Sequence, residues 1–173
     1  AKTFLSILKS INREELSQKD KLNYDIAKKL LEDSIKWNEL KPYLMPIDQM
    51  GGFYTGFARL AEELSFKTAK DYENYIARLN AFGSYTDQYL QLMRIGIKEG
   101  MVPPRIVLEQ IPGTIESLIS EDINESILYQ PFKKFPADFN QSQRARIRSE
   151  GEKAIAQTVR PAYKRILEFI REE

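Results

Sequence analysis

The spacing of apolar residues constrains the fold of this 173-residue chain more than any other feature. Apolar side chains recur every three or four residues through most of the sequence, which is the period of an amphipathic α-helix. Strand signals are nearly absent, because the chain has no sustained apolar–polar alternation and no Asn-Gly or Asp-Gly hairpin turn. The pattern predicts an all-α fold: a multi-helix stack or bundle with irregular loops that contain proline and glycine, and little or no β-strand.

The first 41 residues contain neither proline nor glycine. We expect a short amphipathic helix first, with apolar residues at Phe4, Leu5, Ile7, Leu8 and Ile11. A longer helix follows Ser17, which together with Asp20 resembles a capped start with an acidic first turn. It ends at Lys41, because the residue before Pro42 is pushed out of the α region. One face of this helix carries Leu22, Ile26, Leu30 and Trp37, widened by Ala27, Leu31 and Ile35.

The segment from Pro42 to Gly52 is predicted to be a loop, and its apolar composition indicates that it lies against the body of the protein. A short helix is expected over residues 53–64. Thr68 is a good N-cap for the next helix, which we expect to end at Gly83. Another helix is predicted over residues 85–98, with Gly100 as its C-terminal stop.

Prolines in the last part of the chain are predicted to begin, break or bend its helices. Prolines 103 and 104 are expected to begin a helix, and Pro112-Gly113 to kink or break it. Residues 120–139 are predicted to be irregular. Asn140 is expected to cap the last helix, and Pro161 to bend it.

Composition restricts the chemistry of the chain. There is no histidine and no cysteine, which removes the usual general base, the commonest zinc ligands and the thiol nucleophile.

The formal net charge is +1, so the net charge does not favour binding to a polyanion such as DNA. No run of consecutive apolar residues exceeds three, which excludes a membrane-spanning helix. The length favours one domain, residues 1–173.

Several residues are candidates for a catalytic or anion-binding role. Backbone amides of Gly51–Gly56 before a helix are able to hold an anion, but a structural turn is favoured because no strand precedes it and no Gly-Lys-Ser/Thr follows. Capping and solvated surface positions are the favoured interpretation of the carboxylates at Glu62, Glu63, Asp71, Glu73, Glu150 and Glu152. The sequence therefore assigns no catalytic, cofactor-binding or metal-ligating residue.

Two further groups of side chains have both a functional and a structural interpretation. A spacing of two scatters Arg144, Arg146 and Arg148 around a helix, so nucleic-acid binding is disfavoured. Tyrosines at helical spacing are typical of a core with hydroxyl groups at its rim, or of a substrate groove. The sequence does not decide between these two for Tyr72, Tyr75, Tyr85 and Tyr89.

Several multi-residue motifs occur in one order along the chain. They are PIDQMGG (46–52), TAKDYENYIARL (68–79), YTDQ (85–88), RIGIKEGMVPPRIVLEQ (94–110), LYQPF (128–132) and VRPAYKRILEFIREE (159–173). In this order they resemble the bacterial family catalogued as domain of unknown function 885. Members of that family are several times longer than this chain and are similar to helical, cleft-containing zinc metallopeptidases.

The resemblance implies that this chain is an internal helical segment of an envelope metallohydrolase. The family's His-Glu-x-x-His zinc motif lies downstream of the matched region, and no such motif exists here, because the chain has no histidine. No catalytic or metal residue is therefore carried over, and no cofactor is expected in this chain. Many members carry a secretion or lipoprotein signal, so the resemblance implies the bacterial cell envelope or periplasm.

These observations lead to one main hypothesis and two alternatives. The main hypothesis is a non-catalytic helical scaffold that forms one wall of a substrate cleft, with the remainder of the parent polypeptide as its partner, and with a homodimer in isolation through exposed apolar surface. The final helix stops on two acids that oppose its dipole, so we expect it to continue in a longer protein. The alternatives are an autonomous helical module that binds a protein or peptide and an enzyme that uses carboxylates alone.

Overall fold

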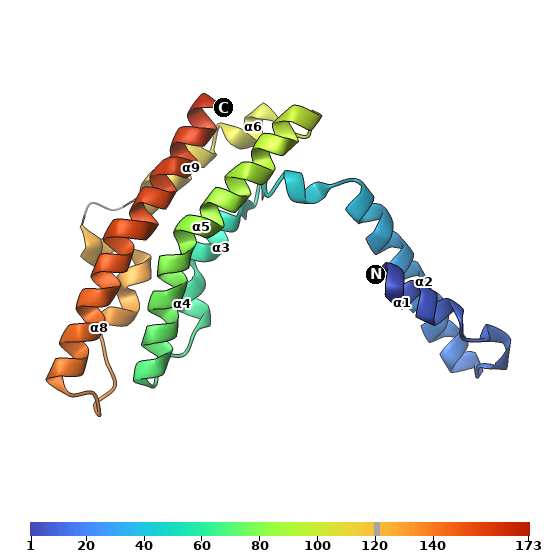
Figure 1. Cartoon of the computed structure of the whole chain (residues 1–173), viewed down its shortest axis with the longest axis horizontal. Coiled ribbons are helices and arrows are strands. Elements are labelled where there is room, and N and C mark those ends of the chain that lie inside the picture. The colour runs from blue at the N-terminus through green and yellow to red at the C-terminus, as the bar shows by residue number, and fades with distance from the viewer. Residues whose placement is uncertain (120–121) are drawn as a thin grey trace. The chain divides into compact units, whose positions relative to one another are not determined.

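The structure is a computed structural model that describes residues 1–119 and 122–173. The chain divides into two compact units, Ala1–Leu44 and Met45–Glu173, which are described separately (Figure 1). Within the described residues the regular structure is helical, apart from one sheet of two short strands. The predicted all-α fold with little β-strand is therefore confirmed. The expectation of a single domain over residues 1–173 stays a prediction.

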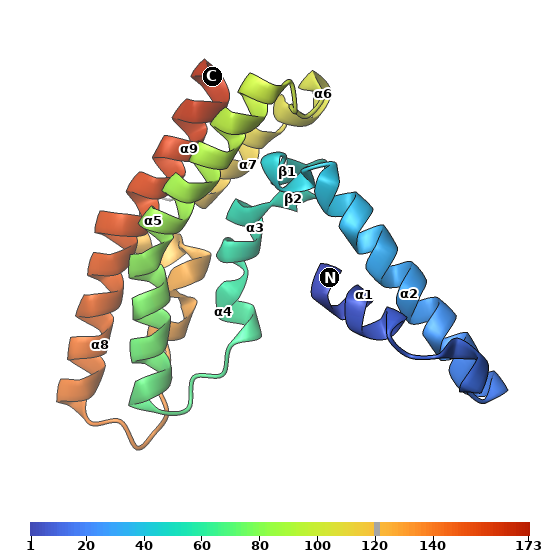
Figure 2. The ribbon, with the colours of Figure 1, turned by 45° about the vertical axis from the view of Figure 1, so that its right-hand side comes forward.

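The first unit is a helical hairpin. Helix α1 (Lys2–Lys9) lies alongside α2 (Gln18–Glu39), and the 3₁₀ turns η1 (Arg13–Glu15) and η2 (Pro42–Leu44) flank α2 (Figure 2). Ser17 caps α2 as predicted, because its hydroxyl accepts a hydrogen bond from the amide of Asp20 at 3.2 Å. Lys41 takes a left-handed conformation with φ of 53°, which ends the helix before Pro42.

This hairpin buries little of its apolar surface. No residue of α1 or α2 is fully buried. The predicted apolar face of α2 is exposed in the structure: Leu22, Ile26, Leu30 and Trp37 each keep about half or more of their surface accessible. On α1 the exposed apolar residues are Phe4 and Ile7. The helical period was therefore predicted correctly, whereas the face that it marks does not form the core of this unit.

The second unit begins with a small antiparallel hairpin of β1 (Ile47–Asp48) and β2 (Gly51–Gly52), in which Ile47 pairs with Gly52. The predicted loop thus contains a short sheet. Its apolar residues are only partly buried as expected: Ile47 of this unit and Leu44 at the end of the first unit are inaccessible, whereas Tyr43 and Met50 are exposed. Two short helices follow, α3 (Phe53–Ala58) and α4 (Leu60–Glu63), where one helix was expected.

Helix α5 (Ala69–Glu99) runs without interruption through Gly83, so the expectation of a helix end there was wrong. Gly83 keeps an ordinary helical conformation, and a Cβ at this position would lie 3.3 Å from a methyl carbon of Thr158. Its small size therefore serves close helix packing instead of a turn. The two ends of α5 match the prediction: Thr68 and Asp71 form a capping box, and Gly100 is left-handed with φ of 73°.

Short helices connect α5 to the last helices. The helix that was expected to break at Pro112-Gly113 is interrupted slightly earlier, at residues 109–110, between α6 (Arg105–Leu108) and α7 (Ile111–Leu118). Pro112 lies in the first turn of α7, where proline is tolerated. The segment predicted to be irregular contains the 3₁₀ turns η3 (Ile123–Glu125) and η4 (Ile127–Phe132); residues 120–121 of that prediction lie outside the described residues.

The final helix is one continuous rod with a local change of winding. Helix α8 (Gln141–Ala154) leads through a π-helical turn, η5 (Ile155–Val159), into α9 (Arg160–Glu172). Asn140 caps α8 in a box with Gln143, as expected. The π turn lies directly before Pro161, and a π turn rearranges the hydrogen bonds of the helix at the place where proline offers no N–H. The predicted bend of the helix at Pro161 stays a prediction.

Helix α5 and the α8–α9 rod lie side by side and run in the same direction (Figures 1 and 2). Three ion pairs follow this order along both helices: Arg146 with Glu73 at 2.8 Å, Arg165 with Asp87 at 3.0 Å, and Arg94 with Glu173. The core beside this helix pair contains large side chains that are almost fully inaccessible to solvent. They are Tyr72, Tyr75, Leu79, Phe82, Phe132, Ile147, Tyr163 and Ile166.

Within the described residues no helix has both the length and the apolar character that crossing a membrane requires.

Gly151 provides a test of this core. A Cβ at Gly151 would lie 2.4 to 2.6 Å from ring carbons of Phe132, a fully buried residue. We expect Gly151→Ala to lower the free energy of unfolding by about 1–3 kcal/mol, because the ring must move within a packed core. The measurement is urea unfolding followed by circular dichroism.

The matched control for this substitution is Gly113→Ala. No atom lies within 4 Å of a Cβ at Gly113, which is also helical. This variant should be unchanged or more stable by up to about 1 kcal/mol, because alanine favours the helix. Equal unfolding free energies for the two variants would contradict the close packing of Phe132 against Gly151.

Candidate functional site

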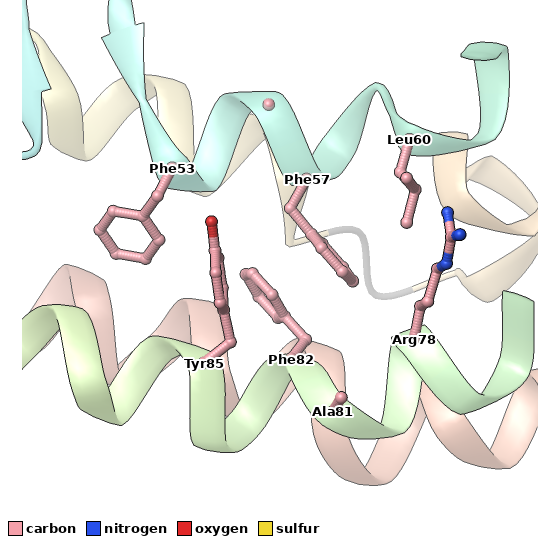
Figure 3. Close-up of a pocket in the computed structure, with 8 residues that line it drawn as sticks. Phe53, Phe57, Leu60, Arg78, Ala81, Phe82 and Tyr85 are labelled. Atoms are coloured by element: carbon pink, nitrogen blue, oxygen red, sulfur yellow. The ribbon is translucent and has the colours of Figure 1, made fainter. Parts of the chain in front are cut away.

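An open groove between α3–α4 and α5 is the candidate site of the second unit (Figure 3). Its volume is about 380 Å³, within the range of small-ligand sites. Its surface is mostly carbon, and the residues that line it are Phe53, Gly56, Phe57, Leu60, Arg78, Ala81, Phe82 and Tyr85. A largely apolar groove with few polar groups is suited to binding.

One wall of the groove comes from α3 and α4. Phe53, Phe57 and Leu60 are spaced by four and three residues, so they share one helical face. The backbone at Arg59, between the two helices, keeps an α conformation, which preserves this face across the break. All three side chains point toward α5 in Figure 3.

The facing wall comes from α5 with the same spacing. Arg78, Phe82 and Tyr85 follow each other at intervals of four and three residues, and Ala81 lies between them. Figure 3 shows the guanidinium group of Arg78 beside Leu60, at the opposite end from Phe53 and Tyr85. The groove therefore has a charged end and an aromatic end.

Aromatic contacts fix both walls. The rings of Phe57 and Phe82 stack across the groove with centroids 3.7 Å apart, and those of Phe53 and Tyr89 stack at 4.3 Å. Tyr85 meets Phe53 edge to face, with centroids at 6.0 Å. Such pairs each contribute about 0.5–1.5 kcal/mol beyond the burial of their area. The groove is therefore formed before any ligand arrives.

Hydrogen bonds of two tyrosines hold this region in place. The hydroxyl of Tyr163 on α9 donates to the carbonyl oxygen of Tyr54 on α3 at 2.9 Å, which connects the α3 wall to the core.

Burial raises the pKa of the Tyr163 phenol well above its ordinary value. At the rim, burial and a hydrogen bond to Tyr89 raise the pKa of Tyr85 to about 12. Both phenols are thus neutral near pH 7.

The glycine segment before α3 has a structural role in this geometry. The amide of Gly52 donates to the hydroxyl oxygen of Thr55 at 3.0 Å, and that hydroxyl donates back to the carbonyl of Gly52 at 2.9 Å. Gly51 has φ of 132°, a conformation that side chains disfavour. These contacts support the structural interpretation of this turn over the anion-binding one.

The carboxylates that the sequence singled out lie outside the groove lining. Asp71 accepts hydrogen bonds from the backbone and hydroxyl of Thr68, and these lower its pKa. Ion pairs join Glu62 to Arg59 at 3.5 Å and Glu73 to Arg146. Within the part of the chain that the structure describes, no three Asp or Glu side chains gather closely enough to hold a metal ion.

The three arginines of α8 make contacts within the chain. Arg144 donates to the carbonyl oxygens of Pro136 and Ala137. The contacts of Arg146 are with Glu73 and Glu150, and those of Arg148 are with the carbonyl of Phe132 and the ring of Phe135. Their spacing scatters them around the helix, as predicted.

The tyrosines divide between the two roles that the sequence left open. Tyr72 and Tyr75 belong to the core, with hydroxyl groups that donate to the carbonyls of Lys134 at 3.3 Å and Leu128 at 2.9 Å. Tyr85 lines the groove, and Tyr89 stacks on its Phe53.

Phe57, Leu60 and Arg78 were not singled out from the sequence. The signal that was available is the matching interval of four and three residues in both segments, 53–60 and 78–85. That signal does not show that the two faces oppose each other, because it carries no information about contacts between helices.

The structure defines this chain as an all-α protein with an open, mostly apolar groove. The sequence profile of a family described as bacterial protein of unknown function (DUF885) matches residues 1–173. The chain therefore belongs to the DUF885 family. No match was found among curated proteins, and none among solved structures.

Burial of the Tyr163 phenol predicts a loss of stability in alkali. The folded-state pKa of Tyr163 is raised, whereas an unfolded tyrosine ionises near about pH 10. The stabilisation is therefore complete below about pH 10 and is lost as the pH rises toward the folded-state pKa. Above about pH 10, ionisation of this tyrosine in the unfolded state lowers the free energy of unfolding by about 1.4 kcal/mol per pH unit. Urea unfolding between about pH 8 and pH 11 measures this slope.

The control is Tyr163→Phe, which removes the phenol and keeps the ring. Its unfolding free energy should fall less steeply over the same pH range, with a remainder that comes from the other tyrosines whose pKa is raised by burial, among them Tyr75 and Tyr85. An unchanged slope in Tyr163→Phe would contradict the assignment of the titration to this residue.

Proposed function

We propose that this chain is a non-catalytic helical segment of a bacterial metallohydrolase-like protein, where it acts as a scaffold and forms one wall of a substrate cleft. The observation that carries the proposal is the preformed groove between α3–α4 and α5. Its walls are aromatic and already fixed by stacking. Such a surface supplies binding and orientation, whereas it offers no nucleophile paired with a base.

The donor set of the chain supports the non-catalytic part of the proposal. A hydrolytic zinc site uses three protein ligands, most often histidines, and leaves one position open. This chain has no imidazole and no thiol, and its carboxylates at Asp71 and Glu73 are engaged in capping and in an ion pair. The residues present do not fit a zinc ion.

Exposed apolar faces of the first unit support the scaffold part. Leu22, Leu30 and Trp37 on α2 and Phe4 on α1 are each more than 60% exposed. Apolar faces of this kind mark surfaces that associate with other protein. We propose that they pack against the remainder of the parent polypeptide, and that they support a homodimer when the chain is isolated. For the parent we propose the cell envelope or periplasm, on the strength of the family resemblance.

The second candidate function is an autonomous helical module that binds a protein or peptide. The same groove favours it, because an open apolar groove between helices is a common site for peptide recognition. The reading frame that encodes the chain discriminates between the two. A continuation that contains His-Glu-x-x-His supports the cleft-wall function, whereas a stop codon directly after residue 173 supports the autonomous module.

A metal and activity assay tests the main proposal. Residues 1–173 are incubated with one equivalent of zinc, desalted and measured by elemental mass spectrometry, and the sample is assayed against peptide and ester substrates. We expect substoichiometric zinc and no hydrolysis above buffer, because the chain lacks the ligands. One tightly held zinc per chain, or turnover that scales with protein concentration, would overturn the non-catalytic assignment.

A further inference from the structure

Arg78 is the charged residue in the lining of an otherwise carbon-rich groove. Within residues 1–119 and 122–173 it makes no hydrogen bond and no ion pair, in contrast to Arg59, Arg94, Arg146 and Arg165, which pair with acids. Its guanidinium group lies next to the side chain of Leu60 (Figure 3). An unpaired guanidinium at the end of an apolar groove is complementary to an apolar ligand that carries one carboxylate.

The length of the groove limits the size of this ligand. Arg78 and Tyr85 are seven residues apart on α5, which corresponds to about 10 Å along the helix axis. An extended peptide rises about 3.3 Å per residue. The distance from the charged end to the aromatic end therefore accommodates about three residues.

The open side of the groove favours a peptide over an alkyl carboxylate. A peptide that lies in the groove presents apolar side chains to Phe57 and Phe82 while its backbone N–H and C=O groups stay in water, which avoids their desolvation cost. The Tyr85 hydroxyl at the far end adds a polar group where such a chain leaves the groove. An alkyl chain in the same place leaves apolar surface exposed along its whole length.

We propose that this groove binds the C-terminal end of an apolar peptide, with the terminal carboxylate at Arg78 and the preceding side chains against Phe57, Phe82 and Phe53. This assignment rests on the proposed function, because it names the ligand of the same cleft wall. Arg78 acts as a binding residue that sets which end of the peptide enters, and the aromatic stack provides the apolar contact area.

The test compares an acid with its amide. The tripeptide acetyl-Leu-Phe-Leu with a free carboxylate and the same peptide as a C-terminal amide are titrated into isotope-labelled residues 1–173, and binding is followed by NMR chemical shifts. We expect the acid to bind about tenfold more tightly than the amide, because the guanidinium–carboxylate pair is lost in the amide. Shifts should centre on residues 53–60 and 78–85.

Two variant pairs locate the effect. Arg78→Gln should remove the preference for the acid, whereas Arg105→Gln should keep it, because the Arg105 side chain is 92% exposed and is not part of the lining. Leu60→Asp places a carboxylate next to Arg78 and should abolish binding of the acid. Leu60→Asn has the same size without the charge, so it should retain the preference for the acid and controls for any loss of stability.

The outcomes separate this inference from the proposed function. Equal binding of acid and amide at the groove overturns the carboxylate assignment and leaves the cleft wall standing. Binding of decanoate in preference to the tripeptide acid overturns the peptide assignment. Binding of none of the three compounds, with the fold of the chain intact, overturns both the inference and the role of the groove as a cleft wall.

Discussion

The packing of α5 against the α8–α9 rod is the contact on which the rest of the second unit depends. The two helices run in the same direction, so their closest surfaces stay in register over most of their length, from Arg146–Glu73 to Arg94–Glu173. Gly83 of α5 allows this approach because it accommodates a methyl group of Thr158 on the rod, and Gly151 of the rod accommodates the ring of Phe132 in η4. Exposed ion pairs add little energy, so the stabilisation comes mainly from the apolar area buried between the helices.

Tyrosine hydroxyls connect this helix pair to the irregular segments around it. Tyr75 donates to the carbonyl of Leu128 in η4, and Tyr163 donates to the carbonyl of Tyr54 in α3. Segments without a full helical hydrogen-bond pattern leave carbonyl groups that need donors when they are buried. The core thus satisfies the backbone of the short helices and at the same time places the α3 wall opposite α5. The groove is a consequence of this arrangement.

The two units differ in how their helices are stabilised. In the second unit the apolar faces meet in a common core, whereas in the first unit α1 and α2 contact each other without burying any residue completely. The first unit instead contains a capped 22-residue helix and exposed local ion pairs, such as Arg13 with Asp25 at 2.6 Å. The apolar faces of α1 and α2 therefore stay largely exposed within this unit.

Sequence patterns alone determined the helical class, the caps at Ser17, Thr68 and Asn140, and the stop at Gly100, because each of these depends on backbone geometry within one or two turns. The absence of histidine and cysteine likewise follows from the sequence and restricts the chemistry before any fold is known. Only the tertiary structure decided that Gly83 continues a helix, because the reason is a neighbouring methyl group 75 residues away in the chain, at Thr158. It also decided which apolar faces are buried and that the faces of Phe57 and Phe82 oppose each other, since periodicity specifies a face but not its partner.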